Sequence, residues 1–405
     1  MTSPKTAQVI GGGIIGLNVA LALQERGLSV VIVDPEAETP SASWGNAGHI
    51  ATEQVEPLAS WGSVKSLPSR LFSGGGAAGF PASAIGAWLP FGLRLMGAAR
   101  PARFAKGKAA LTALLAEALP AWQRRVARLN KPELLKEEGH FIIWESEAST
   151  TKGRAAWQRA DTGTARWRDT TSEETVQLQS RFQCPIVGAI RFTSSASISD
   201  PTDLLYSLRA QFEAQGGSFE RRAADMDQSA LGELTVICAG VASGPLMEQL
   251  GHRAPIIAER GYHIQSPTRD LETGFPPVVF EDRSMVVTPF RSALRATSFV
   301  EFARASDPPD PRKWTRLLAH AKAVGLPFER QPSQWMGARP TLPDYLPAIG
   351  KSDRVPNLIY AFGHQHLGLT TGPITGELVA ALAMGERPAI DTAPFSLSRF
   401  ERNWL

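Results

Sequence analysis

Cysteine and long apolar runs are both scarce in this chain. The two cysteines, Cys184 and Cys238, are too few for a disulfide framework or a cysteine-rich zinc site, so a reducing compartment is the expected location. No window holds about 18 uninterrupted apolar residues, so no membrane-spanning helix is expected. The apolar segment 80–99 contains Pro90 and Arg94. We expect a buried helix-loop-helix there, with contact to a membrane surface as the alternative.

An excess of charge of one sign is also absent. The 42 Lys and Arg residues nearly balance the 39 Asp and Glu residues, which leaves a formal net charge of +3. No stretch contains five consecutive basic residues, so nucleic acid is not an expected partner. Glycines at 11–13 interrupt the first apolar run after four residues, too early for an export signal. We therefore expect a cytoplasmic protein, with peripheral contact to the inner face of the membrane as the alternative.

A nucleotide-binding pattern opens the chain. The apolar run 7–10 predicts a buried strand, and residues 11–16 (GGGIIG) satisfy G-x-G-x-x-G. Apolar residues with helical spacing follow to Arg26, and a second β-branched run, 29–33, is followed by Asp34. Such glycines let the backbone approach a pyrophosphate at a helix N-terminus, and the acid accepts hydrogen bonds from a ribose. The pattern disfavours NADP but leaves NAD and FAD open. The cofactor-binding residues it predicts are Gly11, Gly13, Ile14, Ile15, Gly16 and Asp34.

The remaining pattern indicates two interleaved domains. The 405 residues are 43% hydrophobic, which suits a folded chain of two or three domains. An NAD-dependent dehydrogenase would continue with alternating strands and helices, whereas residues 40–100 lack sustained periodicity. The expected helices are 109–129 with a kink at Pro120, one opened by Asp200 and Pro201, 242–250, and 371–384. The expected strands are 138–144, 234–239 and 357–362, with a mainly antiparallel sheet across 255–302.

Several further motifs carry a family resemblance. They are Asn46-Ala47-Gly48, the strand ending in Cys238-Ala239-Gly240, Gly261-Tyr262, residues 337–340 (GARP) with Pro343, Asp344 and Pro347, and residues 363–373 (GHQHLGLTTGP). With these motifs the chain resembles the FAD-dependent D-amino-acid oxidase superfamily, and most closely its bacterial D-amino-acid dehydrogenases of the small-subunit type. The resemblance favours FAD over NAD as the cofactor.

The resemblance implies an α/β fold in which a Rossmann-like FAD-binding domain is interleaved with an α+β substrate domain built on a mainly antiparallel sheet. We expect residues 1–60, 195–254 and 335–405 to form the FAD-binding domain, and residues 61–194 and 255–334 to form the substrate domain. Backbone N–H groups of Gly368, Leu369 and Thr370 are expected to face the flavin O2 atom and to stabilise negative charge on the ring. The other cofactor contacts implied are Asn46, Ala47, Gly48, Ala239, Gly240, Gly363 and His366.

Three residues are implied as catalytic. Arg339, in the GARP motif, is expected to bind the substrate carboxylate through two parallel hydrogen bonds, with a structural ion pair as the alternative. Tyr262 is expected to direct its phenol at the substrate, unless it is an ordinary sheet tyrosine. His49 follows Asn46-Ala47-Gly48 and is expected to contact the flavin or the substrate, with a loop histidine as the alternative.

Other polar residues are weaker candidates. Arg260 and His263 flank Tyr262, while Glu53, Gln54 and Glu56 follow His49 and are placed to read a hydroxyl or ring nitrogen of the substrate. His364 and His366 form an H-x-H pair, but no further ligand lies at a suitable spacing, so no metal is expected.

The resemblance implies an enzyme that moves a hydride from Cα of a D-amino acid to flavin N5. The imino acid formed is then hydrolysed to a 2-oxo acid. D-Proline or a hydroxy-D-proline is a candidate substrate, and a quinone or another carrier is the expected electron acceptor. The alternatives are a glycine- or sarcosine-type amine oxidase that uses oxygen, and a non-catalytic FAD-binding partner subunit. A flavin-dependent tRNA-modifying protein would need a basic face that the charge balance does not offer.

Overall fold

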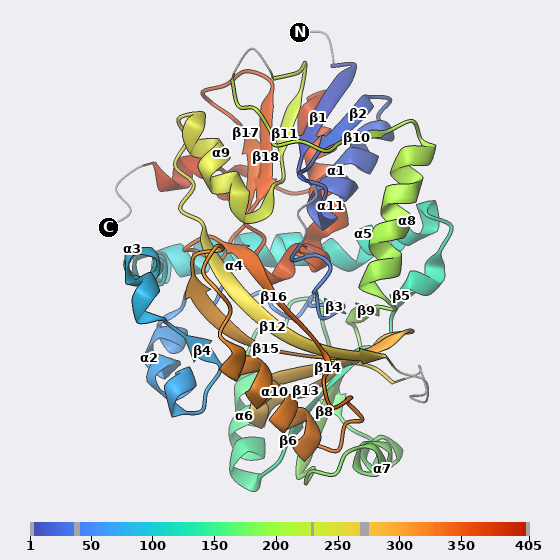
Figure 1. Cartoon of the computed structure of the whole chain (residues 1–405), viewed down its shortest axis with the longest axis vertical. Helices are drawn as coiled ribbons and strands as arrows, with labels where there is room; N and C mark the ends of the chain where they lie inside the picture. The colour runs from blue at the N-terminus through green and yellow to red at the C-terminus, as the bar shows by residue number, and fades with distance from the viewer. Residues whose placement is uncertain (1–3, 36–40, 228–230, 268–274, 402–405) are drawn as a thin grey trace.

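Two β-sheets, one above the other in Figure 1, organise the chain. The computed structural model describes residues 4–35, 41–227, 231–267 and 275–401. The upper sheet is mainly parallel and the lower sheet is mainly antiparallel. The chain passes between the two sheets several times, so each sheet is built from segments that are far apart in the sequence (Figure 1).

The upper sheet has six strands in the order β10-β2-β1-β11-β18-β17. Neighbouring strands run parallel except β17, which is antiparallel to β18. In sheet order the strands are Ser218–Glu220, Ser29–Val33, Thr6–Ile10, Thr235–Ile237, Leu358–Phe362 and Ala348–Lys351. The strand order reverses at β1, and in such sheets a ligand crevice opens at the carboxyl ends of the strands beside the reversal.

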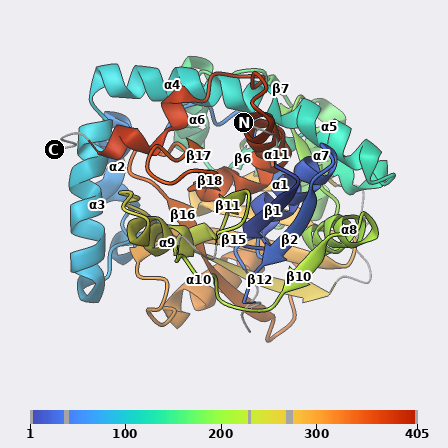
Figure 2. The same ribbon diagram turned by 90° about the horizontal axis from the view of Figure 1, so that it is seen from above.

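Both faces of the upper sheet are covered because side chains alternate along each strand. Val9 and Val236 lie in one apolar cluster with α4 (Pro101–Ala116) and the four helices named next, whereas Ile10 and Ile237 lie in a second cluster with α9 (Ser243–Gln249). These four helices are α1 (Ile14–Gln24), α5 (Ala118–Arg128), α8 (Pro201–Ala214) and α11 (Gly368–Met384). Seen from above, α5 and its neighbour α4 run along one side of the molecule (Figure 2).

Glycines allow α1 to pack closely at two points. A Cβ atom on Gly16 would lie 1.8 Å from the carbonyl oxygen of Gly11, so the first turn of α1 rests directly on the preceding loop. A Cβ atom on Gly376, in α11, would lie 2.4 Å from the carbonyl oxygen of Asn18. The two helices therefore meet backbone to backbone, and their N-terminal ends are held in one fixed arrangement.

The lower sheet has nine strands, with β4 (Ala78–Gly79) paired to β15 outside the main order β16-β12-β15-β14-β13-β6-β8-β7. In that order the strands are Ser333–Thr341, Ile257–Pro267, Ala293–Ala303, Met285–Pro289, Val278–Phe280, His140–Trp144, Gly188–Phe192 and Trp167–Asp169. The pairs are antiparallel except β13–β6 and β15–β4. Helix α10 (Pro311–Ala323) packs on β12 and β15.

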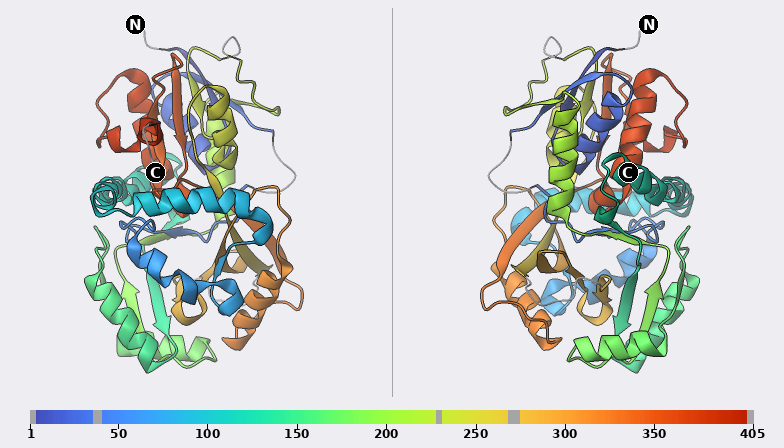
Figure 3. Two further views of the ribbon diagram at one scale, coloured as in Figure 1. Left: turned by 90° about the vertical axis from the view of Figure 1, so that its left-hand side faces the viewer. Right: turned by 90° about the vertical axis from the view of Figure 1, so that its right-hand side faces the viewer.

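Smaller elements complete the lower half. A three-stranded sheet in the order β3-β9-β5 joins His49–Ile50, Ala196–Ile198 and Leu135–Lys136. The remaining helices are α2 (Trp61–Arg70), α3 (Ile85–Ala98), α6 (Glu147–Arg159) and α7 (Ser172–Arg181). Helices α2 and α3 lie on the same side of the molecule in the left view of Figure 3.

The expected α/β fold with an antiparallel second sheet is confirmed, and several local expectations need correction. The helix expected at 109–129 is two helices that meet at Glu117, not at Pro120, because Pro120 lies in the first turn of α5, where proline is tolerated. Helices α4 and α5 were placed in the substrate domain but pack in the core of the upper sheet. The expected domain boundary at residue 335 divides strand β16, which belongs entirely to the lower sheet.

The segment 80–99 is a single helix, α3, after a short turn, not a helix-loop-helix. Its Phe91 and Ala98 are buried, while four apolar side chains are exposed at spacings of three and four residues. We call them the α3 stripe: Ile85, Leu89, Leu93 and Met96, which are 50%, 46%, 47% and 38% exposed. By length and composition alone, Gln365–Met384 is long and apolar enough to cross a membrane, but 72% of its apolar window is buried within the structure.

Replacing Gly16 with alanine should destabilise the protein, because the new methyl group would collide with the backbone of Gly11. We expect a loss of about 3 kcal/mol in the free energy of unfolding, in the range of other overpacked sites, together with loss of bound cofactor. Thermal unfolding and the cofactor content of Gly16→Ala would measure this. Gly62→Ala is the matched control, because its nearest neighbour is 3.7 Å away. Equal melting temperatures for the two variants would refute this packing argument.

Candidate active site

A cavity of about 1540 Å³ lies between the two sheets. One end is lined by the glycine loop at the carboxyl end of β1, with Gly12 and Asp34. The other end is lined by His49, Glu53 and Arg339. The cavity is continuous, so it has room for an extended dinucleotide and a small substrate together.

The glycine loop has the geometry of a dinucleotide site. Gly11 has a φ of +106°, and a Cβ atom there would lie 2.6 Å from the carbonyl oxygen of Cys238, so a side chain is excluded. The Gly12 N–H donates a hydrogen bond to Asp34 Oδ2 at 2.6 Å, which fixes this carboxylate at the end of β2. Ser43, which the sequence analysis did not predict, accepts from the Ile14 N–H at 3.0 Å at the start of α1.

The cavity gathers most of the predicted cofactor residues. The lining includes Gly11, Gly13, Ile14, Ile15, Asp34, Asn46, Ala47, Ala239, Gly240, Gly363, His366, Gly368 and Leu369. The predicted contacts Gly16, Gly48 and Thr370 are not among the lining residues. Gly48 has a φ of +75° and packs on Phe290, so its role is to turn the loop.

The start of α11 is tied to the loop that carries His49. The helix begins at Gly368, three residues earlier than predicted, and its positive end faces the cavity at Gly368 and Leu369. Thr370 is fully buried, and its Oγ1 atom accepts a hydrogen bond from the Ala51 N–H at 3.0 Å. The side chain of Trp122 donates to the Leu369 carbonyl oxygen at 2.9 Å. The segment is thus fixed from both sides.

Arg339 lies in the cavity wall, as predicted, and is positioned by its neighbours on β12. Its Nη1 atom is 3.3 Å from Glu259 Oε1, and the two residues are directly opposite in the β12–β16 ladder. Glu259 also accepts hydrogen bonds from Thr341 at 3.1 Å and Tyr345 at 3.0 Å. A Cβ atom on Gly261 would lie 2.2 Å from Arg339 Nη2, so the guanidinium group occupies the space that this glycine leaves free.

The prediction that Tyr262 directs its phenol at the substrate is wrong. Side chains alternate along β12, so Glu259, Gly261 and His263 share the cavity face while Tyr262 points to α10 on the other face. Its hydroxyl donates to Glu301 at 2.7 Å, and the side chain is fully buried. Arg260 pairs with the same carboxylate. Both residues therefore stabilise the sheet–helix contact and do not line the cavity.

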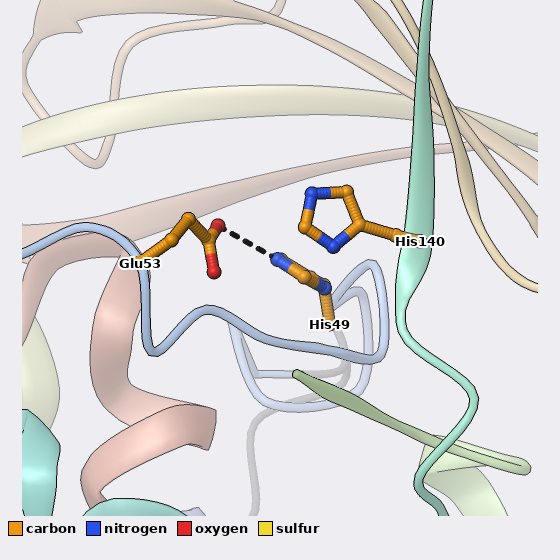
Figure 4. A group of neighbouring side chains, drawn as sticks. All are labelled: His49, Glu53 and His140. Carbon is orange, nitrogen blue, oxygen red and sulfur yellow. Dashed lines mark hydrogen bonds and ion pairs between the residues drawn. The ribbon is translucent and has the colours of Figure 1, made fainter. Parts of the chain in front are cut away.

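His49, Glu53 and His140 form a polar cluster at the substrate end (Figure 4). His49 Nε2 and Glu53 Oε1 are 2.9 Å apart. His140, on β6, stands edge-on to His49 with ring centroids 4.4 Å apart, and its Nδ1 atom bonds Ser195 Oγ at 2.9 Å. Burial alone would raise the pKa of Glu53, but the charge and hydrogen bond of His49 outweigh it and hold the pKa at about 2.

The other polar candidates have separate roles. Gln54 bonds His366, and both line the cavity. His364 lines it too and bonds Thr375 at 3.1 Å. His263 bonds the Gly45 carbonyl oxygen and stacks on Trp335, a lining residue. Glu56 is not among the lining residues and pairs with Lys108 at 2.9 Å.

Sequence reasoning missed His140 and Trp335 as well as Ser43. His140 lies in the strand predicted at 138–144 and is the first residue of β6, but no local pattern says which face of that strand meets the cavity. Trp335 lies two residues before the GARP motif, and alternation from Arg339 would have placed it on the same face. Ser43 lies in a loop with no periodic signal.

Buried histidines make the stability of the fold depend on pH. Burial lowers the pKa of His140, His263 and His364 to about 3 and that of His366 to about 4, from an ordinary value of 6.5. Below pH 6.5 these histidines are protonated in the unfolded chain, whereas in the folded chain they stay neutral until the pH reaches 3 to 4. The free energy of unfolding must therefore fall as the pH drops through this window. Calorimetry in buffers of different ionisation enthalpy should find uptake of roughly three to four protons on unfolding at about pH 5.5. No uptake there, or equal uptake at about pH 8, would refute this assignment.

Comparisons with known proteins agree with this geometry. The family model described as FAD dependent oxidoreductase (DAO) matches residues 7–382. The D-amino-acid oxidase of Bradyrhizobium diazoefficiens is 29% identical, with 99% of this chain and 100% of the relative covered. A D-amino acid dehydrogenase of Helicobacter pylori is 25% identical, with 94% and 95% covered.

Solved structures share the fold. Glycine oxidase from Geobacillus kaustophilus superposes with a TM-score of 0.73 at 19% identity, with 98% of this chain and 99% of that chain covered. L-Proline dehydrogenase from P. horikoshii gives 0.69 at 13% identity, with 99% of both chains covered. At these identities the likeness supports the fold alone. The glycine cradle and Asp34 fit this family. The match over residues 7–382 shows that the chain belongs to the DAO family of FAD-dependent oxidoreductases.

Proposed function

We propose that this FAD enzyme oxidises a D-amino acid at Cα and passes the electrons to a quinone or another carrier. D-Proline and a hydroxy-D-proline are the cyclic substrates to test first. The observation that carries the proposal is the position of Arg339, whose guanidinium group lies in the wall of the same cavity as the glycine cradle. Relatives named D-amino-acid oxidase and D-amino acid dehydrogenase support the choice of substrate and of enantiomer.

Arg339 binds the substrate carboxylate. A planar guanidinium group offers two parallel N–H donors, which match the two oxygens of a carboxylate. Glu259 contacts Nη1 from one side and is itself held by Thr341 and Tyr345, so the fork cannot rotate freely. A fixed fork orients Cα, and orientation is the main contribution that a protein makes to hydride transfer.

The proposed reaction needs FAD as the immediate oxidant, water for the hydrolysis and the electron acceptor for reoxidation of the cofactor. When bound, FAD accepts the hydride that leaves Cα, and the amino nitrogen loses one proton, so the product is an imino acid. Water then adds to the C=N bond and releases ammonia and a 2-oxo acid. A cyclic substrate gives a cyclic imine as the immediate product. The positive end of α11 at Gly368 and Leu369 stabilises the negative charge gained on the cofactor.

Replacing Arg339 with lysine should lower kcat/KM for the best D-amino acid by about 30- to 100-fold, because one point charge replaces a two-pronged contact. The reductive half-reaction is followed anaerobically as loss of flavin absorbance. Arg124→Lys is the matched control, since Arg124, on α5, pairs at the surface with Glu377 of α11. An unchanged kcat/KM in Arg339→Lys would refute the assigned role of Arg339.

The same assay separates the alternatives. Reduction by glycine or sarcosine with rapid reoxidation in air would favour an amine oxidase. Flavin that no amine reduces would favour a non-catalytic partner subunit. Slow reoxidation in air, with fast reoxidation by a quinone analogue, is the result expected for the proposed dehydrogenase.

We also propose that the enzyme is cytoplasmic and contacts the inner face of the membrane through the α3 stripe, where a quinone would be reached. The stripe exposes four apolar side chains, and Trp61 on the adjacent helix α2 is 45% exposed. Lys65, Arg70 and Arg100 are exposed on or beside the same two helices. Apolar side chains flanked by basic residues suit the surface of an anionic bilayer.

Replacing Leu89 and Leu93 together with aspartate should weaken binding to phosphatidylglycerol vesicles by about tenfold or more, because each leucine buried in lipid contributes about 1.5–3 kcal/mol. Vesicle flotation measures binding, and turnover with a soluble acceptor should be unchanged. Val176→Asp, at a 63% exposed apolar site on α7, is the control. Failure of the unmodified protein to float with these vesicles would contradict the proposed contact.

A further inference from the structure

The His49–Glu53 pair leaves two polar atoms without a partner inside the cavity wall. His49 Nε2 and Glu53 Oε1 bond each other at 2.9 Å, while His49 Nδ1 and Glu53 Oε2 have no hydrogen-bond partner in the protein. The Glu53 residue is only 4% exposed, so water does not freely satisfy its free oxygen. Unpaired buried polar atoms destabilise a protein, so a ligand that pairs with these atoms is favoured.

The pair is held rigidly at the substrate end of the cavity. His49 is paired with Ser197 in the small sheet, and the Ala51 N–H bonds Thr370 at the start of α11. The ring of His140 packs edge-on against His49 and is stacked on Phe192 with ring centroids 4.7 Å apart. Arg339 and His366 line the same cavity as the pair, so the guanidinium group and the pair border one space.

The two free atoms suit a hydroxyl group. Glu53 is ionised at neutral pH, because its pKa is held at about 2, so Oε2 is a strong acceptor. Nε2 faces a carboxylate, which can only accept, so Nε2 carries the proton and Nδ1 is an acceptor in neutral His49 or a donor in charged His49. A hydroxyl group both donates and accepts and therefore satisfies either state. An ammonium group, which can only donate, pairs with both atoms only while His49 is neutral, and an alkyl group leaves both atoms unpaired.

We propose that the His49–Glu53 pair recognises a hydroxyl group on the side chain or ring of the substrate, so that the enzyme prefers hydroxylated D-amino acids. This inference rests on the proposed function, because Arg339 holds the other end of the substrate. Sites that bind a substrate hydroxyl discriminate strongly against the analogue that lacks it, since their own polar groups are then left unpaired.

A metal ion is the competing occupant. Ligand atoms of His49, Glu53 and His140 lie within 4.8 Å of one another. However, His49 Nε2 and Glu53 Oε1 already bond each other, and Ser195 occupies Nδ1 of His140. The arrangement in Figure 4 is that of a hydrogen-bonded pair with an aromatic neighbour, so we argue for the hydroxyl group and make the metal an outcome of the test.

The test compares matched substrates with the purified holoenzyme under anaerobic conditions. The pairs are 4-hydroxy-D-proline and D-proline, D-serine and D-alanine, and D-threonine and D-2-aminobutyrate. The rate constant of flavin reduction and its dependence on substrate concentration give a preference ratio for each pair. We expect the hydroxylated member to be favoured at least tenfold in one or more pairs. Glu53→Gln and His49→Asn should each reduce that ratio at least fivefold, chiefly through weaker substrate binding.

Glu56→Gln is the matched control, because Glu56 lies on the same loop but pairs with Lys108 outside the cavity lining. Flavin content and melting temperature establish that each variant is folded. The preference ratio of the unmodified enzyme tests the inference even if a variant fails to fold. Reduction by D-amino acids without any hydroxyl preference overturns this inference alone. A preference that survives both variants, or that chelators abolish and Zn²⁺ restores, also overturns it. If no amino acid reduces the flavin, the proposed function fails together with it.

Discussion

The backbone contact between α1 and its surroundings is the constraint on which the rest of the structure depends. Gly16 rests on the Gly11 carbonyl group, and Gly376 of α11 rests on Asn18, so the two helices are fixed to each other and to β1. One helix N-terminus then faces the dinucleotide end of the cavity, and the other faces the substrate end. A larger residue at either glycine would move both helix ends, because protein interiors are packed too densely to absorb the displacement.

The lower sheet supplies the substrate end, and its register decides which side chains take part. Strands β12 and β16 are paired so that Glu259 lies opposite Arg339 and Gly261 leaves room for the guanidinium group. A shift of one residue would turn Arg339 to the face of α10. The opposite face is stabilised by its own charged group, in which Glu301 binds Tyr262, Arg260 and Lys313. The sheet thus carries the Glu301 ion cluster on one face and the Glu259–Arg339 pair, which borders the cavity, on the other.

Sequence reasoning succeeded where function depends on a short, ordered segment. The glycine loop, Asp34 and the segment around Gly368 could be predicted because strand, turn and helix follow each other within a few residues. It failed for Tyr262 because proximity to Gly261 in the chain does not say which face of a sheet a side chain takes, and the ladder to β15 shifts register between Arg260 and Tyr262. It placed the helix break at Pro120, although proline in the first turn of a helix needs no N–H partner.

By itself the sequence determined the nucleotide-binding half of this protein, the antiparallel second sheet and the arginine of the substrate end. Each of these depends on local periodicity, glycine backbone freedom or a contiguous motif. Only the tertiary structure brought His140 from β6 against His49 and Glu53, and placed Trp335 and His263 in one stack beside the cavity. These groups are far apart in the chain, and their meeting depends on strand register and on the close approach of two sheets, which no local pattern encodes.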